Sequence, residues 1–285
     1  MTTLAGWLGA DSRGPASLYL VSDSRITWFR DAGGGRKIVE ATWDHGRKTF
    51  ACRASAEILG YAGDVLLPTQ TIGQITDLID SGAVSLADET PERKLEWIVK
   101  SLETSCSAYP KPAGRNFSLL YGGRQGSGMT CAFFAFVVEI KDGIAAAPIG
   151  LEIPQSSSPL TYEDGQKRFA FGSGRDGFRE HWNKWRVSEV GGTSRSVFSA
   201  FADHVKSGVD PYTGGPPQLV GIYRVGPAKT FGTIWNQRRF LSGMEAIDVS
   251  DEKRLNWHND LFELCDPLTM QLRKTAQPQP RPKNF

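Results

Sequence analysis

The chain has 285 residues, of which 40% are hydrophobic and 22% charged, and its formal net charge at pH 7 is +2. Basic residues are scattered along the sequence, so no electrostatic surface for nucleic acid is expected. No apolar run approaches the roughly eighteen residues of a membrane span, and no basic segment leads into an apolar core at the N-terminus, so neither a membrane anchor nor a secretory signal is predicted.

The first part of the chain predicts strands. Residues 4–8 and 17–22 are rich in apolar side chains and flank a segment with turn chemistry. Residues 31–46 contain consecutive glycines and many charges, so we expect a loop or hairpin insertion there. Residues 48–52 and 58–61 predict the next pair of strands.

Two helices are predicted to follow. Apolar residues between 72 and 79 recur at helical spacing. The second helix has stronger start signals, because Thr90 is suited to the N-cap and Pro91 to the first helical position. Leu95 and Ile98 then mark its apolar face.

The middle of the chain returns to strands. Residues 117–121 and 130–140 have strand composition and flank the glycine-rich segment 122–128. A phosphate-binding loop would need a Gly-Lys-Ser/Thr ending, which this segment lacks, so a hairpin connection is favoured. Residues 150–167 are rich in proline and serine and predict a surface loop.

The remaining elements are two helices and two strands. One helix is expected after Gly174 and one over residues 193–207, followed by strands at 219–224 and 229–235. The tail, residues 277–285, contains three prolines and little apolar material, so its composition favours disorder.

The predicted order is strands, two helices, strands, two helices and strands. Two antiparallel sheets covered on their outer faces by helices account for this order, so the predicted fold class is α+β, a four-layer αββα sandwich. No change in composition marks a domain boundary before the tail. We therefore assign residues 1–265 to a single domain and residues 266–285 to a Pro-rich C-terminal extension with a disordered end.

Thr2 directly follows the initiator methionine. If Met1 is removed, one residue carries both a hydroxyl and a free α-amine, which titrates near ~7.7–8.0. Such an amine can accept the hydroxyl proton, so the residue is a nucleophile with its own base. Many chains begin Met-Thr, however, and the pair alone is equally compatible with an N-terminus of no consequence.

Other catalytic patterns are not indicated. The four histidines lack metal-ligand spacing with one another or with cysteine. The four cysteines are far apart and form no metal-type pairs, so we expect them to be buried and reduced in a cytoplasmic protein. A Gly-x-Ser-x-Gly motif, the mark of a serine hydrolase, does not occur. We expect neither a metal nor a cofactor.

A set of short segments occurs in a characteristic order along the chain. They are Thr2-Thr3, Ser22-Asp-Ser-Arg25, Lys48-Thr-Phe, Tyr61-Ala-Gly63, and Gly172-Ser-Gly174 with Asp210-Pro-Tyr-Thr-Gly-Gly215. Together they resemble the β-type subunits of the proteasome family, including the bacterial peptidase that partners a ring-forming ATPase. The family belongs to the N-terminal-nucleophile hydrolases. The resemblance covers roughly residues 2–235, with insertions at 31–46 and 150–167.

The resemblance implies roles for the terminal threonine and for three residues around it. Thr2 would be the nucleophile and, through its α-amine, the general base. The ammonium of Lys48 would lower the pKa values of the Thr2 hydroxyl and amine by charge proximity, and Asp23 would hold Lys48 in an ion pair. Gly63 would offer its backbone N–H to the oxyanion, where one such donor is worth roughly 2.7–4 kcal/mol.

Each of these residues also has an ordinary structural interpretation, as a surface lysine, a strand-end aspartate or a turn glycine. Lys48 lies fifteen residues before Gly63, close to the family's spacing between its catalytic lysine and its oxyanion glycine. Lys37 is the second candidate for the lysine, because it lies nearer to the family's distance from the nucleophile. The pattern around Lys37 fits less well.

The resemblance also assigns residues in the second half of the chain. Ser173 resembles the serine that hydrogen-bonds the terminal amine, and Asp210 and Thr213 resemble the Asp-x-x-Ser-Gly element that positions both. Threonine at the fourth position departs from that element but keeps the hydroxyl, and the segment could otherwise be an ordinary turn. By the same alignment Thr27 would hydrogen-bond the substrate backbone. Tyr61 would line the pocket for the side chain before the cleaved bond, or would simply pack at a strand end.

The implied function is that of a threonine peptidase of the proteasome-like type, acting on a peptide or an unfolded protein. Loss of Met1 alone would expose the nucleophile, so control is expected from assembly into a homo-oligomeric ring. A ring-forming ATPase of the kind the family uses is a candidate partner, which the sequence leaves open. Two alternatives stay open. The chain could be a non-catalytic structural subunit, or an N-terminal-nucleophile amidase acting on a small amide.

Overall fold

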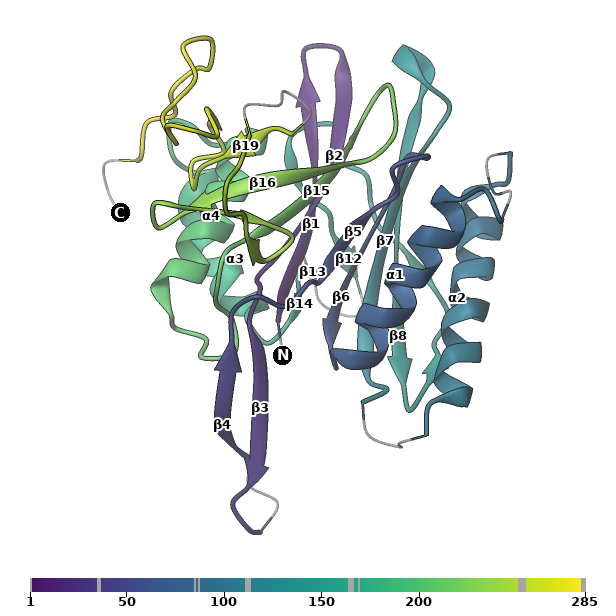
Figure 1. The fold of residues 1–285 in the computed structure, drawn as a ribbon. Coiled ribbons are helices and arrows are strands. Elements are labelled where there is room, and N and C mark those ends of the chain that lie inside the picture. The colour runs from purple at the N-terminus through teal and green to yellow at the C-terminus, as the bar shows by residue number, and fades with distance from the viewer. Residues whose placement is uncertain are drawn as a thin grey trace.

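The computed structural model describes residues 2–34, 37–84, 86, 88–110, 114–163, 167–168, 170–250 and 255–282. Within these ranges the protein is a mixed α/β structure with several antiparallel sheets and four α-helices (Figure 1). None of the helices in the described ranges has the length and apolarity that a bilayer crossing requires.

The larger sheet contains ten of the described strands and is built around the N-terminal strand. Its path runs in the order β11 (Ser158–Pro159), β1 (Thr3–Asp11), β2 (Gly14–Ser22), β15 (Gln218–Tyr223), β16 (Lys229–Trp235), β17 (Arg238–Leu241) and β18 (Met244–Glu245). Three further strands lie off this path: β14 (Phe171–Gly172) pairs with β1, β19 (Trp257–His258) with β16, and β20 (Leu264–Cys265) with β19.

The second sheet consists of six of the described strands. Its path is β10 (Ile149–Gly150), β8 (Ala132–Lys141), β7 (Phe117–Gln125), β6 (Glu57–Gly63) and β5 (Thr49–Ala51), with β9 (Ile144–Ala145) paired to β8. Strand β7 runs through the glycine-rich segment that the sequence places in a connection. The strand can continue here because residue 122 is glycine. A side chain at this position would place its Cβ only 2.8 Å from Leu18 Cδ2 of the other sheet. The short 3-10 helix Gly128–Thr130 then completes the connection to β8.

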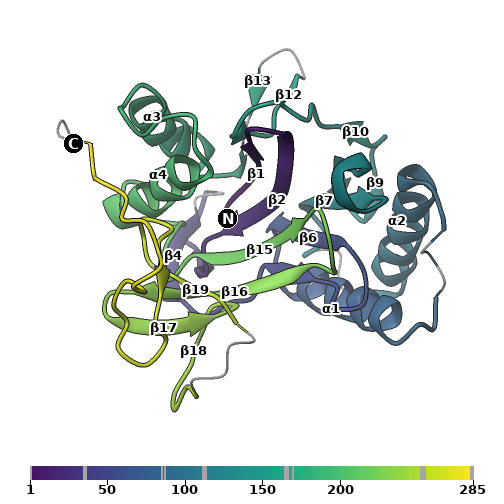
Figure 2. The same cartoon turned by 90° about the horizontal axis from the view of Figure 1, so that it is seen from above.

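Four α-helices lie outside the sheets, as Figure 2 shows from above. They are α1 (Leu66–Asp80), α2 (Pro91–Ala108), α3 (Arg175–Arg186) and α4 (Ser194–Ser207). The start of α2 is the one that its sequence predicts, with Thr90 Oγ1 accepting from the Arg93 N–H and Pro91 in the first turn. Helix α4 is capped in the same way by Thr193, whose Oγ1 accepts from the Ser196 N–H.

Buried apolar side chains form three main clusters. The first lies between the sheets and includes Leu4 and Leu8 of β1 with Leu120 of β7. The second joins Ala5 and Trp7 of β1 to helices α3 and α4, and the third joins the second sheet to α1 and α2. Successive residues of β1 therefore enter different cores, as the two-residue period of a strand requires.

The insertion at 31–46 forms a hairpin of β3 (Ile26–Asp31) and β4 (Lys37–Trp43), which projects away from the sheets in Figure 1. Part of the 150–167 segment differs from the predicted surface loop. Strand β11 pairs with β1, placing Pro159 opposite Trp7, and β12 (Tyr162–Glu163) pairs with β13 (Lys167–Arg168).

The C-terminal tail lies against α4 as far as residue 282. Arg195 Nη1 donates to the Gln277 carbonyl at 2.8 Å, Gln279 Nε2 donates to Ser199 Oγ at 3.0 Å, and Arg281 pairs with Asp203. These contacts differ from the disorder that composition favours for residues 277–285. Residues 283–285 lie outside the described ranges.

One buried ion pair, between Lys94 of helix α2 and Glu57 of strand β6 in the second sheet, gives a stability prediction. Lys94 Nζ lies 2.7 Å from Glu57 Oε1, and both side chains are nearly inaccessible. Substituting Lys94→Met leaves the buried Glu57 carboxylate without its counter-ion, with only the Ser55 hydroxyl still donating to it, so the free energy of unfolding in urea should fall by about 3–5 kcal/mol.

The control is Arg93→Met, one residue earlier on the same helix. It removes the exposed pair between Arg93 and Glu96, and should change the free energy of unfolding by less than about 1 kcal/mol. Equal losses in the two variants would contradict the assignment of Lys94 as a buried counter-ion.

Candidate active site

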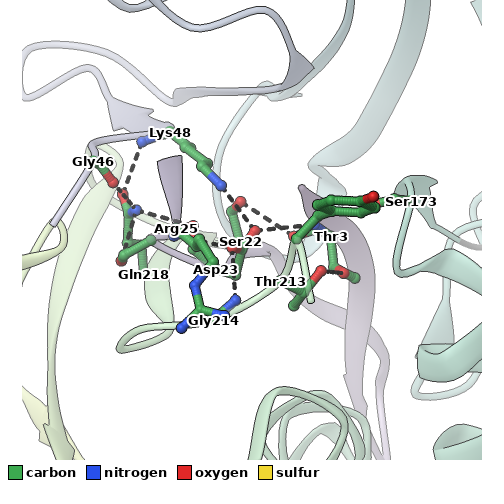
Figure 3. Close-up of polar contacts among 12 residues, drawn as sticks. Thr3, Ser22, Asp23, Arg25, Gly46, Lys48, Ser173, Thr213, Gly214 and Gln218 are labelled. Carbon is green, nitrogen blue, oxygen red and sulfur yellow. Dashed lines mark hydrogen bonds and ion pairs between the residues drawn. The ribbon is translucent and has the colours of Figure 1, made fainter. Parts of the chain in front are cut away.

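Asp23 is a fully buried carboxylate directly after β2, and it organises the polar groups around it (Figure 3). Its Oδ1 accepts from the Thr3 N–H at 2.9 Å and from Lys48 Nζ at 3.0 Å. Its Oδ2 accepts from the Arg25 N–H at 3.0 Å and from the Gly214 N–H at 3.1 Å. Both oxygens are thus matched by two donors each, which is the condition for burying a carboxylate.

Lys48 lies directly before β5 and is also fully buried. Burial lowers the pKa of its ammonium, and the neighbouring Asp23 carboxylate opposes that shift. The backbone around it is fixed by Gln218, whose Oε1 accepts from the Lys48 N–H at 2.9 Å and whose Nε2 donates to the carbonyls of Asp23 and Gly46. One side chain at the start of β15 therefore ties together the segments that supply both members of the ion pair.

Thr2 lies at the entrance of β1 and has no accessible surface. The N–H that reaches Asp23 belongs to the peptide bond joining Thr2 to Thr3, so Thr2 is placed beside the Asp23–Lys48 pair. On its other side Thr3 pairs with Gly172 of β14. Gly172 has φ +89°, and a Cβ there would lie 1.9 Å from the Thr2 carbonyl oxygen, so only glycine permits this approach.

A second carboxylate, Asp210, accepts from hydroxyl groups next to the Thr3 side chain. Its Oδ2 accepts from Ser173 Oγ and from Thr213 Oγ1, each at 2.8 Å. Thr213 Oγ1 lies 2.7 Å from Thr3 Oγ1. Thr3 therefore contacts both groups: its N–H donates to Asp23, and its hydroxyl meets Thr213 (Figure 3).

Gly63 ends β6 in a conformation that requires glycine, with φ +128° and a would-be Cβ only 2.6 Å from the Asn116 carbonyl oxygen. Two residues earlier on the same strand, the Tyr61 N–H donates to the Lys48 carbonyl at 3.2 Å. Alternate N–H groups of a strand share one edge. The Gly63 N–H is therefore directed to the edge that carries Lys48, beyond the first residue of β5.

Two other sequence-predicted residues lie apart from this group. Tyr61 is buried in the core beneath α1, with its hydroxyl donating to the Arg47 carbonyl at 3.0 Å and lying 2.5 Å from Thr69 Oγ1. Thr27 lies on β3 opposite Thr42, and its buried hydroxyl has no hydrogen-bond partner among the described residues.

The second lysine candidate, Lys37, begins β4. It pairs across the hairpin with Asp31. Its side chain lies outside the described part of the structure. Lys48 is thus the candidate that contacts Asp23.

The structure adds residues that sequence reasoning missed. Thr3 bridges the two carboxylate groups, Gln218 fixes the backbone of Lys48, and His204 of α4 lies 3.1 Å from Thr3 Oγ1 through its Nε2. A histidine inside an otherwise apolar helix face, and a glutamine opening a buried strand, are the signals that could have indicated the last two. The described residues contain no group of three or more histidine, cysteine or acidic side chains placed to hold a metal ion.

No protein-family model and no curated protein matches this sequence. The chain is similar to the solved structure of an Anbu (Gly-1) mutant from Hyphomicrobium sp. strain MC1, with a TM-score of 0.47 and 14% identity over 81% of this chain and 87% of that one. It is also similar to Anbu (ancestral beta-subunit) from Yersinia bercovieri, with a TM-score of 0.48 and 12% identity over 84% and 86%. Because both TM-scores lie below 0.5, we draw no conclusion about function from these likenesses.

The contact between Gly172 and Thr2 can be tested by adding one methyl group. Gly172→Ala and Gly14→Ala both place alanine at positive φ, +89° and +99°, but nothing lies within 4 Å of the added carbon at Gly14. The backbone strain of about 1–3 kcal/mol is common to both. The clash with Thr2 should lower the free energy of unfolding of the Gly172 variant by a further ~1–3 kcal/mol, measured in urea. Equal losses would show that Thr2 is not held against β14.

Proposed function

We propose that the protein is an N-terminal threonine hydrolase that cleaves peptide bonds, with Thr2 as nucleophile once it is the first residue of the mature chain. One observation carries the proposal: the Thr3 N–H and Lys48 Nζ share a single oxygen of the buried Asp23. This sharing holds a buried ammonium beside the residue whose hydroxyl must be activated. Burying an ion pair seldom increases the stability of a fold. A buried lysine at this position is therefore better explained by a function than by the needs of the fold.

In the proposed reaction the Thr2 hydroxyl attacks the carbonyl carbon of the scissile bond, and its proton moves to the Thr2 α-amine. The Lys48 ammonium stabilises the developing negative charge on the hydroxyl oxygen and keeps the neighbouring amine in its neutral, basic form. The Gly63 N–H stabilises the oxyanion of the tetrahedral intermediate.

The intermediate then breaks its C–N bond, and the proton held by the α-amine passes to the leaving amine. An ester between Thr2 and the acyl part of the substrate remains. Water attacks this ester with the same amine as base, which restores the hydroxyl and releases the acid. Ser173, Thr213 and Asp210 are the groups proposed to hold the amine, because they are hydrogen-bonded to one another and reach the residue after Thr2 through Thr3 Oγ1.

The proposal extends to the fold. A four-layer αββα sandwich of the N-terminal-nucleophile type is supported by one core between the two sheets and one beneath each pair of helices. We also propose, from the family resemblance, that the protein assembles into a homo-oligomeric ring and that an ATPase is its partner. Measuring the native mass of the purified protein would test the ring directly.

A pocket of about 840 Å³ adjoins the candidate site. Its wall includes Gly46 and Arg47, which precede Lys48, and apolar groups that include Ile26, Val65 and Met244. We propose that this pocket takes the side chain before the cleaved bond. Tyr61, expected to line it, instead supports it from the core through the Arg47 carbonyl and the Thr69 hydroxyl, since Arg47 and Thr69 both belong to the wall.

Intact mass after exposure to a peptide electrophile that condenses with both the hydroxyl and the amine of a terminal threonine tests the nucleophile. We expect one adduct on a chain that begins at Thr2, with none in Thr2→Ala and a retained adduct in Thr2→Ser. Lys48→Met should lose the adduct while the terminus is still processed, because the hydroxyl is no longer activated.

The matched control is Lys94→Met, which also removes a buried lysine from an ion pair but lies away from Thr2. It should keep the adduct wherever the variant is folded. Adduct formation in Lys48→Met, or a wild-type chain with a free Thr2 that gives no adduct, would favour the non-catalytic structural subunit.

The pocket predicts the substrate side chain. Fluorogenic peptides with leucine before the cleaved bond should have a kcat/KM at least about tenfold above those with aspartate. Most of the lining is apolar, and the guanidinium of Arg47 already lies over the Phe50 ring and donates to the Thr49 carbonyl. Val65→Asp should lower leucine cleavage, whereas Val225→Asp, at an exposed position outside the pocket, should not. Rapid turnover of small amides without turnover of peptides would favour the amidase alternative.

A further inference from the structure

His204 is a buried histidine that the proposed reaction leaves without a role. It lies on α4 with 1% of its surface exposed. Its Nε2 lies 3.1 Å from Thr3 Oγ1, while its Nδ1 is buried and has no hydrogen-bond partner among the described residues. A buried polar atom without a partner is uncommon and calls for a physical explanation.

The position of the ring is fixed by two glycines at the start of α3. A Cβ on Gly174 would lie 1.9 Å from Thr3 Oγ1 and 2.6 Å from His204 Nε2. A Cβ on Gly177 would lie 2.7 Å from His204 Cε1. Both positions are thus kept free of side-chain atoms, and the space is filled by the imidazole and by the hydroxyl groups it meets.

The direction of each hydrogen bond in this group follows from the carboxylate at its end. Asp210 as a carboxylate only accepts, so the single hydroxyl proton of Thr213 goes to Asp210 Oδ2. Thr3 must then donate its own proton across the 2.7 Å contact to Thr213. With that proton committed, Thr3 Oγ1 can only accept from the ring, so His204 must donate from Nε2.

The same reasoning fixes the tautomer of the ring. With its proton on Nε2, neutral His204 carries a lone pair on Nδ1, the atom for which the described part of the chain offers no partner. Burial lowers the pKa of His204 to about 4, with His181 of α3 adding to the shift and Asp210 opposing it. The ring is therefore neutral at pH 7. The buried atom that lacks a partner among the described residues is thus a neutral nitrogen with a lone pair, and not the N–H of a charged imidazolium.

We propose that His204 is a positioning residue that sets a one-way hydrogen-bond chain, from His204 through Thr3 and Thr213 to Asp210. Ser173 donates to the same Asp210 oxygen from the other side. The hydroxyl protons of Thr3, Thr213 and Ser173 are then all committed to hydrogen bonds that end at one carboxylate. The three hydroxyl oxygens can therefore only accept further hydrogen bonds. If Thr2 acts as the proposed function requires, its α-amine then meets only hydrogen-bond acceptors in this group. The amine donates to them and keeps its own lone pair to accept the proton of the Thr2 hydroxyl.

The direction of the chain can be measured without any substrate. In the intact protein labelled with nitrogen-15 histidine, a long-range proton–nitrogen spectrum at pH 7 should show His204 as a single tautomer protonated at Nε2. Thr3→Val removes the acceptor and should abolish this preference. A His204 protonated at Nδ1 would make Nε2 an acceptor, reverse the chain, and overturn the proposal.

Two amide substitutions of His204 distinguish a role in positioning the hydrogen bonds from a role in packing alone. In His204→Gln the amide nitrogen can occupy the place of Nε2, whereas in His204→Asn the same amide is one methylene shorter and falls at Nδ1. We expect kcat for peptide cleavage to fall about tenfold in the Asn variant, the equivalent of one hydrogen bond, with KM within about twofold. The Gln variant should recover most of the loss.

Equal kcat values in the Gln and Asn variants, with equal urea midpoints, would overturn the role in catalysis. Should the wild-type protein form no adduct and cleave no peptide, the proposed function fails. The nitrogen spectrum then decides the direction of the chain by itself, so the two failures are distinguishable.

Discussion

Asp23 carries a fully buried carboxylate, and a group of that kind persists in a folded protein only when donors match both of its oxygens. Those donors come from β1, from the segment before β5, from its own turn and from the loop before β15. Segments separated by up to 191 residues are thereby held at one point. The entrance of β1, where Thr2 lies, can be placed as it is only because this carboxylate is satisfied.

Glycine is the second requirement of the site, because backbone and side chains approach more closely there than a Cβ would allow. Gly172 admits the Thr2 carbonyl, and Gly174 admits the hydroxyl of Thr3 beside His204. The Gly-Ser-Gly segment therefore serves two purposes at once. Its serine donates to Asp210, and its glycines make room for the groups that surround the terminal threonines.

The two carboxylates act differently on their surroundings. Asp23 pairs with a cation, so the charges cancel inside the protein and the ammonium stays close to Thr2. Asp210 collects hydroxyl protons, so it orders neutral groups rather than balancing a charge. In the proposed reaction, the Asp23–Lys48 pair acts on the Thr2 hydroxyl and the Asp210 group on its amine, so the nucleophile and the base have separate environments.

Local signals were sufficient for much of the fold. The cap at Thr90, the apolar periodicity of α1 and α2 and the apolar run of β1 depend on neighbours in sequence, and these elements include the residues that the sequence predicts. The ends of elements were less predictable. Strand β7 continues through Gly122 because the facing sheet approaches there, and β11 forms because an edge of β1 is open to it.

The sequence by itself determined which residue types are present in family order: a threonine at position 2, an acid, a lysine, and glycines at strand ends. It favoured Lys48 over Lys37 by the surrounding pattern, but sequence distance does not say which ammonium reaches Asp23. Only the tertiary structure decided that, by placing Lys37 on a projecting hairpin and Lys48 in the core. It alone also brought His204 to Thr3, a contact across 201 residues that no local pattern encodes, since side chains meet there through the packing of α4 on β1.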